Sequence, residues 1–101
     1  MSHTEKKILV KLKHSADSEV EPIPIRTGSR PNHRFSSFPE EYFMGVFELI
    51  DLSELKSGEF CDAYVHVLYH NLIEKEFYIG NVWEVTSASK HIGYCEIIDI
   101  T

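Results

Sequence analysis

The chain reads FCDAYVHVLY from Phe60 to Tyr69, and its side chains alternate between two sets along this stretch. A period of two is the pattern that a pleated strand imposes. The more apolar set predicts the face that packs into a core, and it comprises Cys61, Ala63, Val65, Val67 and Tyr69. The other set contains Asp62 and His66 and predicts the more polar face. The stretch is therefore expected to be a strand with one buried side.

Similar patterns extend outward from this stretch in both directions. From Lys7 to Lys13, the apolar residues Ile8, Val10 and Leu12 alternate with residues that predict a mostly solvent-exposed face. The side chains of Tyr42 to Asp51 (YFMGVFELID) also alternate between two faces of a strand. A short strand is expected from Asn32 to Phe35. β-Branched and aromatic residues from Phe77 to Val85 and from His91 to Ile100 predict two more strands. No helix of useful length is predicted.

Turn signals separate these segments. Ser57-Gly58-Glu59 predicts a tight turn, Leu52 to Lys56 a single helical turn capped by Ser53, and both His70 to Lys75 and Thr86 to Lys90 hairpin connections. Six or seven short strands joined by turns are typical of a closed barrel or a sandwich, since closure removes exposed sheet edges. The sequence thus predicts an all-β fold.

Length and composition narrow the function classes. The 101 residues predict one domain, 1–101, with a polar and flexible tip at 1–6. Formal net charge is -6, with seven Lys or Arg against four acids in residues 1–35 and three against twelve in residues 36–101. An acidic chain repels phosphate backbones, so nucleic-acid binding is disfavoured. Two distant cysteines and the lack of a long apolar run predict a reducing, cytoplasmic location without membrane insertion.

The candidates for chemistry are histidines and cysteines. His66 and His70, with His33 or His91, could hold a metal ion, but four residues along a strand separate two side chains by about 13 Å. We therefore expect no metal site and no cofactor. A Cys61 or Cys95 thiol paired with His91 would be an alternative catalytic pair, but both cysteines lie on apolar strand faces. His66 is expected to pair with a cross-strand acid such as Asp62 or Glu96.

A surface for a protein partner is a further candidate. Arginine and aromatic residues dominate interface hot spots, and four of them are close in sequence: Arg30, Arg34, Phe38 and Tyr42. We expect these residues to bind a protein partner. An RNA-binding alternative uses the cations of the basic N-terminal third, which are Lys11, Lys13, Arg26, Arg30 and Arg34.

The order of these signals resembles one family, the third domain of translation elongation factor Tu and of related translation GTPases. The resemblance covers most of the chain. It is carried by Gly28, Arg30, Pro31 and Phe35 in GSRPNHRF, by the acid-ended strand Met44–Asp51, by the turn Ser57-Gly58-Glu59, and by the final Ile92–Ile97 segment. It implies a small closed Greek-key β-barrel of about six strands, present here as a standalone domain.

The resemblance also bears on function. The chain has no GxxxxGK[ST] phosphate loop, so we expect neither nucleotide binding nor GTP hydrolysis. In the full factor the third domain works by docking to tRNA and to the other domains. The resemblance therefore implies a non-catalytic protein-binding module, such as an immunity protein or a regulator that competes with the factor's own third domain. A tRNA-binding barrel and a small enzyme with a Cys/His or metal site are the alternatives.

Overall fold

The described part of the chain consists of strands and one short 3₁₀ helix. The computed structural model describes residues 4–15, 24–37, 41–69, 71–87 and 90–100. The elements in chain order are β1 (Thr4–His14), β2 (Ile25–Arg26), β3 (Asn32–Arg34), β4 (Phe43–Leu49), β5 (Glu54–Leu55), β6 (Phe60–Tyr69), the 3₁₀ helix η1 (Asn71–Glu76), β7 (Val82–Ser87) and β8 (Lys90–Ile100). No helix in these ranges has the length and apolar character needed to span a membrane.

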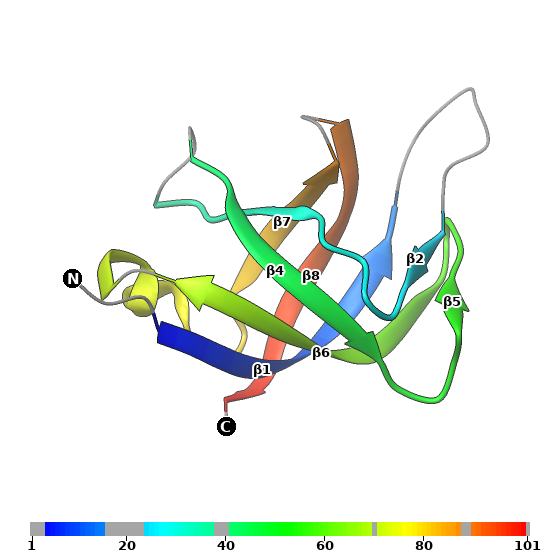
Figure 1. The fold of residues 1–101 in the computed structure, drawn as a ribbon, viewed down its shortest axis with the longest axis horizontal. Coiled ribbons are helices and arrows are strands. Elements are labelled where there is room, and N and C mark those ends of the chain that lie inside the picture. Colours follow the sequence, from blue (N-terminus) through cyan, green and yellow to red (C-terminus); the bar gives the residue numbers. More distant parts are fainter. Residues whose placement is uncertain (1–3, 16–23, 38–40, 70, 88–89, 101) are drawn as a thin grey trace.

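Six of the strands close into an antiparallel barrel. Their order around the barrel is β1-β6-β4-β3-β7-β8, and β8 pairs with β1 to complete the closure. β3, β4 and β6 follow one another around the wall while β1 lies beside β6, which is a Greek-key order. β2 and β5 form a separate two-stranded ladder at one end, and η1 lies at the other end (Figure 1). The predicted all-β closed barrel of six strands is confirmed.

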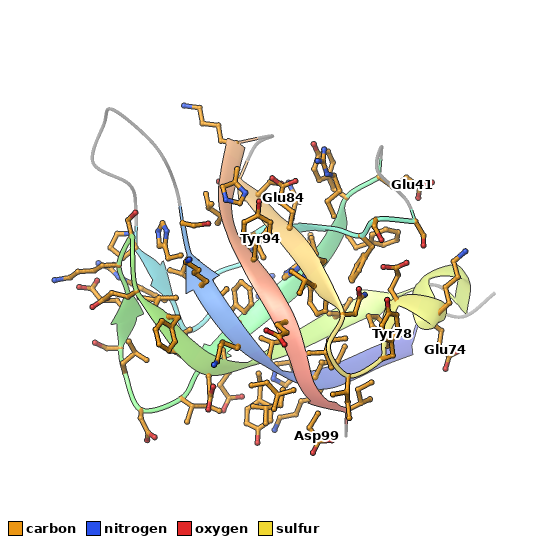
Figure 2. The ribbon with its side chains drawn as sticks, turned by 180° about the vertical axis from the view of Figure 1, so that it is seen from behind. Glu41, Glu74, Tyr78, Glu84, Tyr94 and Asp99 are labelled. Atoms are coloured by element: carbon orange, nitrogen blue, oxygen red, sulfur yellow. The ribbon has the colours of Figure 1, made fainter. Side chains whose placement is uncertain are left out.

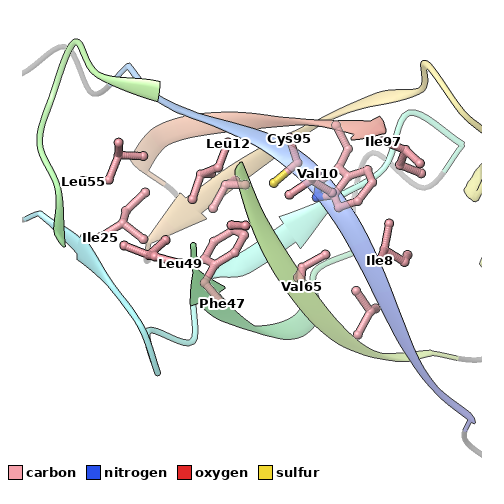
Figure 3. Close-up of a cluster of buried hydrophobic side chains, with 14 of the residues drawn as sticks. Ile8, Val10, Leu12, Ile25, Phe47, Leu49, Leu55, Val65, Cys95 and Ile97 are labelled. Carbon is pink, nitrogen blue, oxygen red and sulfur yellow. The ribbon is translucent and has the colours of Figure 1, made fainter. Parts of the chain in front are cut away.

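Side chains of alternating residues fill the barrel. Val10 on β1 lies opposite Ala63 on β6, so the predicted core faces of these two strands meet, and Phe47 on β4 packs with them opposite Val65. Figure 3 shows this cluster, to which the β2/β5 ladder adds Ile25 and Leu55. Burying side chains of this size contributes about 1.5 to 3 kcal/mol each relative to exposure. The period of two therefore identified the core correctly.

Two predicted connections are wrong. The chain from His70 to Lys75 is not a hairpin, because β6 pairs with β1 and β4 while β7 pairs with β3 and β8. Most of this segment is η1, which carries the chain across the end of the barrel; His70 lies outside the described residues. The single helical turn predicted over Leu52–Lys56 is instead the site of β5, because Leu55 is buried beneath β2.

The strand predicted from Phe77 begins only at Val82. Between them the chain turns at Gly80, which has a positive φ of 92°. Beside this turn the buried Glu76 accepts a hydrogen bond from the Asn81 amide at 3.2 Å. The Ser36 hydroxyl lies 3.4 Å from the same carboxylate, and Ser37 donates to its other oxygen. The carboxylate thus ties the β3–β4 loop to the end of η1.

Candidate functional site

A hollow lies on the outer face of the barrel where β6, β1, β8 and β7 run side by side. Its volume is about 270 Å³, and most of its exposed lining is apolar. The lining residues are Lys11, Lys13, Phe60, Val82, Tyr94 and Glu96. Phe60 is 66% exposed, Val82 49% and Tyr94 44%, although all three side chains are large and apolar or aromatic. Contiguous exposed apolar side chains of this kind mark binding surfaces in single-domain proteins.

A second hollow adjoins the first across β7. It has a volume of about 330 Å³ and shares Val82 and Tyr94 with the first. Its other lining residues are Arg34, Phe35, Ser36, Trp83 and Glu84. Figure 2 shows Glu84 and Tyr94 close together on the face turned to the viewer, as expected for a directly opposed pair on β7 and β8. We call the two hollows together the outer groove.

The ladder register explains why the groove crosses so many strands. Lys13 on β1 lies opposite both Phe60 on β6 and Tyr94 on β8. Glu84 on β7 lies opposite Tyr94 on one side and opposite Arg34 on β3 on the other. Opposed residues point to the same face of a sheet. The register therefore produces one row of large side chains across five strands.

Charge in the groove is mixed. Arg34 forms an ion pair with Glu84 at 2.9 Å, and the Lys11 ammonium lies 5.4 Å from the centre of the Phe60 ring. Among the described residues, neither Lys11 nor Lys13 forms an ion pair with a carboxylate. Their two ammonium groups lie beside apolar surface, where an anionic group of a partner could approach them.

The predicted partner residues do not form one compact surface. Arg34 is at the end of β3 and Tyr42 directly precedes β4, so the antiparallel pairing of His33 with Phe43 makes them neighbours in this hairpin. Arg30 is exposed at the opposite end of β3, and Phe38 lies outside the described residues. Of the three that the structure describes, only Arg34 lines the outer groove. Arg30 and Arg34 are close in sequence, but β3 places them at opposite ends of a strand.

The cations of the RNA-binding alternative are also divided. Lys11 and Lys13 are on the outer face of β1, whereas Arg26 is on β2 and binds Glu54 on β5 at 3.1 Å. Arg34 is held by Glu84. Phosphate binding depends on clustered cations that can displace counterions. Two of the five cations are instead paired with carboxylates.

His33, one of the histidines weighed as a possible metal ligand, is a core residue. The indole Nε1–H of Trp83 donates to His33 Nδ1 at 2.9 Å, and His33 Nε2 lies 3.3 Å from the carbonyl oxygen of Gly45. Nε2 therefore carries the proton and donates to that carbonyl. Burial lowers the pKa of His33 to about 4, and the hydrogen bond to Gly45 offsets only part of this effect. Both ring nitrogens are engaged, which leaves none for a metal ion.

His66 pairs with a cross-strand acid, but with a different one from those predicted. Its Nε2 lies 3.3 Å from Glu48 Oε1 on β4. Glu96 is not a cross-strand neighbour of His66, because β4 lies beside β6 and β8 does not. Within the described ranges, no three residues of the types His, Cys, Asp and Glu converge as a metal site would require.

The cysteines do not pair with His91. Cys95 is fully buried, and burial raises the pKa of its thiol well above the ordinary range, with a smaller effect of nearby Cys61. Burial also raises the pKa of Cys61 to about 11, helped by the negative charges of Asp62 and Glu59. His91 instead contacts Glu84 and Ser15, two residues that the sequence did not single out. Neither thiol has the electropositive setting of a reactive cysteine.

No protein-family model matches this chain, and no curated protein matches it.

Proposed function

We propose that the protein is a binding module that docks to a protein partner through the outer groove. The observation that carries the proposal is that the exposed Phe60, Val82 and Tyr94 side chains line one hollow on the outside of a closed barrel. A partner that covers these side chains displaces water from them. Burial of apolar surface favours binding by about 25 cal/mol per Å². Closure of the barrel leaves the wall with no free edge, so side chains rather than backbone groups must make the contact.

The chemistry of the groove indicates what the partner presents. Its apolar floor fits an aliphatic or aromatic side chain, and the Lys11 and Lys13 ammonium groups fit a neighbouring carboxylate. Glu96 lies opposite Lys11 in the β1/β8 ladder. Its carboxylate would repel a partner surface that carries only negative charge. We therefore specify the partner as a protein segment with a large apolar residue next to an Asp or Glu. The resemblance to the third domain of elongation factor Tu supports a docking role of this kind, which a regulator or an immunity protein would share.

Photo-cross-linking from the groove tests the proposal. A benzophenone amino acid replaces Val82 in the protein expressed in its native cells, and a second version carries it at Ile79, which is exposed outside the groove. We expect the Val82 version to capture one protein, cross-linked at a segment that contains a large apolar residue beside an acid. Lys13→Glu and Phe60→Ala in the Val82 version should each reduce the capture at least tenfold.

Matched controls separate docking from loss of folding. Each variant should retain a cooperative thermal unfolding transition, because Lys13 and Phe60 are exposed on the outer face. Identical cross-links from positions 79 and 82, or capture that is unaffected by both substitutions, would contradict the proposal. Salt-dependent retention of tRNA by the purified protein, weakened by Lys11→Glu and Lys13→Glu, would favour the RNA-binding alternative in its place.

A further inference from the structure

Three polar side chains form a hydrogen-bonded chain beside Tyr94 at the end of the outer face. The Ser15 hydroxyl lies 2.8 Å from His91 Nε2, and His91 Nδ1 lies 2.8 Å from Glu84 Oε2. Ser15 directly follows β1, His91 is on β8 and Glu84 is on β7. All three are only part-buried, and the His91 side chain is 28% exposed, so solvent and small molecules can reach them.

The proton positions follow from the partners. An ionised carboxylate can only accept hydrogen bonds, so His91 Nδ1 carries a proton and donates it to Glu84. In the neutral imidazole, Nε2 then has a free lone pair and accepts the hydroxyl proton of Ser15. This is the arrangement in which a histidine can withdraw a proton from a serine hydroxyl. Arg34 contacts the second carboxylate oxygen of Glu84 at 2.9 Å and fixes its orientation.

An irregularity in the β7/β8 ladder brings His91 to this position. Val85 pairs with Gly93 but the next residue, Thr86, pairs with His91, so Ile92 is an additional residue in β8. Ile92 packs against the core, and the bulge turns His91 to the outer face instead. The side chain of His91 can therefore reach Glu84 on one side and Ser15 on the other. Bulges of this kind often re-aim side chains at active sites.

We propose that Ser15 is a nucleophile for the hydrolysis of carboxylic esters, with His91 as its general base and Glu84 as the residue that orients His91. The Ser15 oxygen forms a bond to the acyl carbon, its proton passes to His91 Nε2, and the carbonyl electron pair moves to the acyl oxygen. That pair returns as the bond to the alcohol oxygen breaks, and His91 gives its proton to the departing alkoxide. Water then attacks the acyl-serine, a proton passes through His91 back to Ser15, and the carboxylic acid leaves.

Two neighbouring side chains suit this chemistry. Lys13 lies on the outer face of β1 two residues before Ser15, which is about 7 Å along an extended chain. Its ammonium group can approach the negative charge that forms on the acyl oxygen. The Tyr94 ring lies 4.7 Å from the His91 ring and supplies apolar surface beside the nucleophile. Esters with short apolar acyl groups are therefore the expected substrates.

Labelling with a fluorophosphonate tests the proposal without any docking partner. The serine oxygen displaces fluoride from phosphorus, and mass spectrometry of the digested wild-type protein identifies the modified residue. We expect Ser15 to react at least 100-fold faster than the exposed Ser53 of the same molecule, since general-base assistance contributes about 10²- to 10⁴-fold. The protein should also hydrolyse 4-nitrophenyl acetate, and modification of Ser15 by the fluorophosphonate should abolish this activity.

Substitutions distinguish catalysis from a structural hydrogen bond. His91→Ala should lower the Ser15 labelling rate at least 100-fold and Glu84→Gln should lower it about tenfold or more, whereas Ser53→Ala should leave ester hydrolysis unchanged. Equal labelling of Ser15 and Ser53 in the wild-type protein would overturn the proposal even if His91→Ala failed to fold. Labelling of Ser15 at an undiminished rate in a folded His91→Ala variant would overturn it as well.

Discussion

Acidification should destabilise the barrel through one residue, the buried His33. Burial lowers its pKa in the folded protein to about 4, whereas the ordinary value is 6.5. As the pH falls from 6.5 to about 4, the unfolded chain takes up a proton at His33 and the folded protein does not. The stability that neutral His33 contributes is therefore present above pH 6.5 and is lost across this window.

The structure sets the size of the loss. A shift of about 2.5 pKa units corresponds to roughly 3 to 4 kcal/mol at about 1.4 kcal/mol per unit, and most of it falls between roughly pH 7.5 and pH 4.5. Solvent does not weaken this effect, because His33 is fully buried. This loss is a large fraction of the total stability of a domain of this size, which is about 5 to 15 kcal/mol.

Urea unfolding at both pH values, followed by Trp83 fluorescence, measures the effect. His33→Asn removes the titration while an amide oxygen replaces Nδ1 as the acceptor for Trp83. We expect wild type to lose roughly 2 to 3 kcal/mol more than His33→Asn over this pH range. His66→Asn controls for removal of an imidazole on the outer face. Parallel losses in wild type and His33→Asn, within about 0.5 kcal/mol, would refute the reasoning.

Three further predictions concern the barrel wall and its ends. Gly93→Ala should lower the free energy of unfolding by at least about 2 kcal/mol in urea titrations, because a Cβ there would lie 2.2 Å from the carbonyl oxygen of Lys13; an unchanged midpoint would contradict this close approach. Iodoacetamide should modify Cys61 roughly 100-fold more slowly than an unperturbed thiol at pH 8, since its pKa is about 11, and should modify Cys95 only on unfolding; rapid modification of either in the native protein would be inconsistent with their burial. Glu76→Ala should cost about 1 to 3 kcal/mol, measured by thermal unfolding, because two serines lose their acceptor and Asn81 keeps only the backbone carbonyl of residue 76; a neutral effect would show that the carboxylate does not tie the two segments together.

The sequence predicted the parts of the fold that depend on local periodicity. The alternation from Phe60 to Tyr69 and from Lys7 to Lys13 identified two strands and their buried faces, because the opposite face of each strand is exposed to solvent. It did not predict which strands are neighbours. The segment His70–Lys75 resembled a hairpin because it is short and polar, but β6 and β7 have other partners, and the path across the barrel end depends on contacts between distant residues.

The candidate site was harder to predict for the same reason. The outer groove joins residues that are distant in sequence. The alternation of β6 placed Phe60 on the more polar face, but no sequence pattern indicated that Phe60 would meet Val82 and Tyr94 in one hollow. The contact between Ser15 and His91 spans 76 positions, and it depends on a bulge at Ile92 that periodicity does not reveal. His91 was considered as a catalytic base, but only with the cysteines.

The docking proposal depends on which face of the barrel a partner covers, and amide chemical shifts measure this directly. The ¹⁵N-labelled protein is titrated with the peptide segment captured by cross-linking from position 82. We expect the largest shifts at Lys13, Val82 and Tyr94 on the outer groove. Shifts confined to Arg30 and Tyr42, with the groove residues unchanged, would contradict the account.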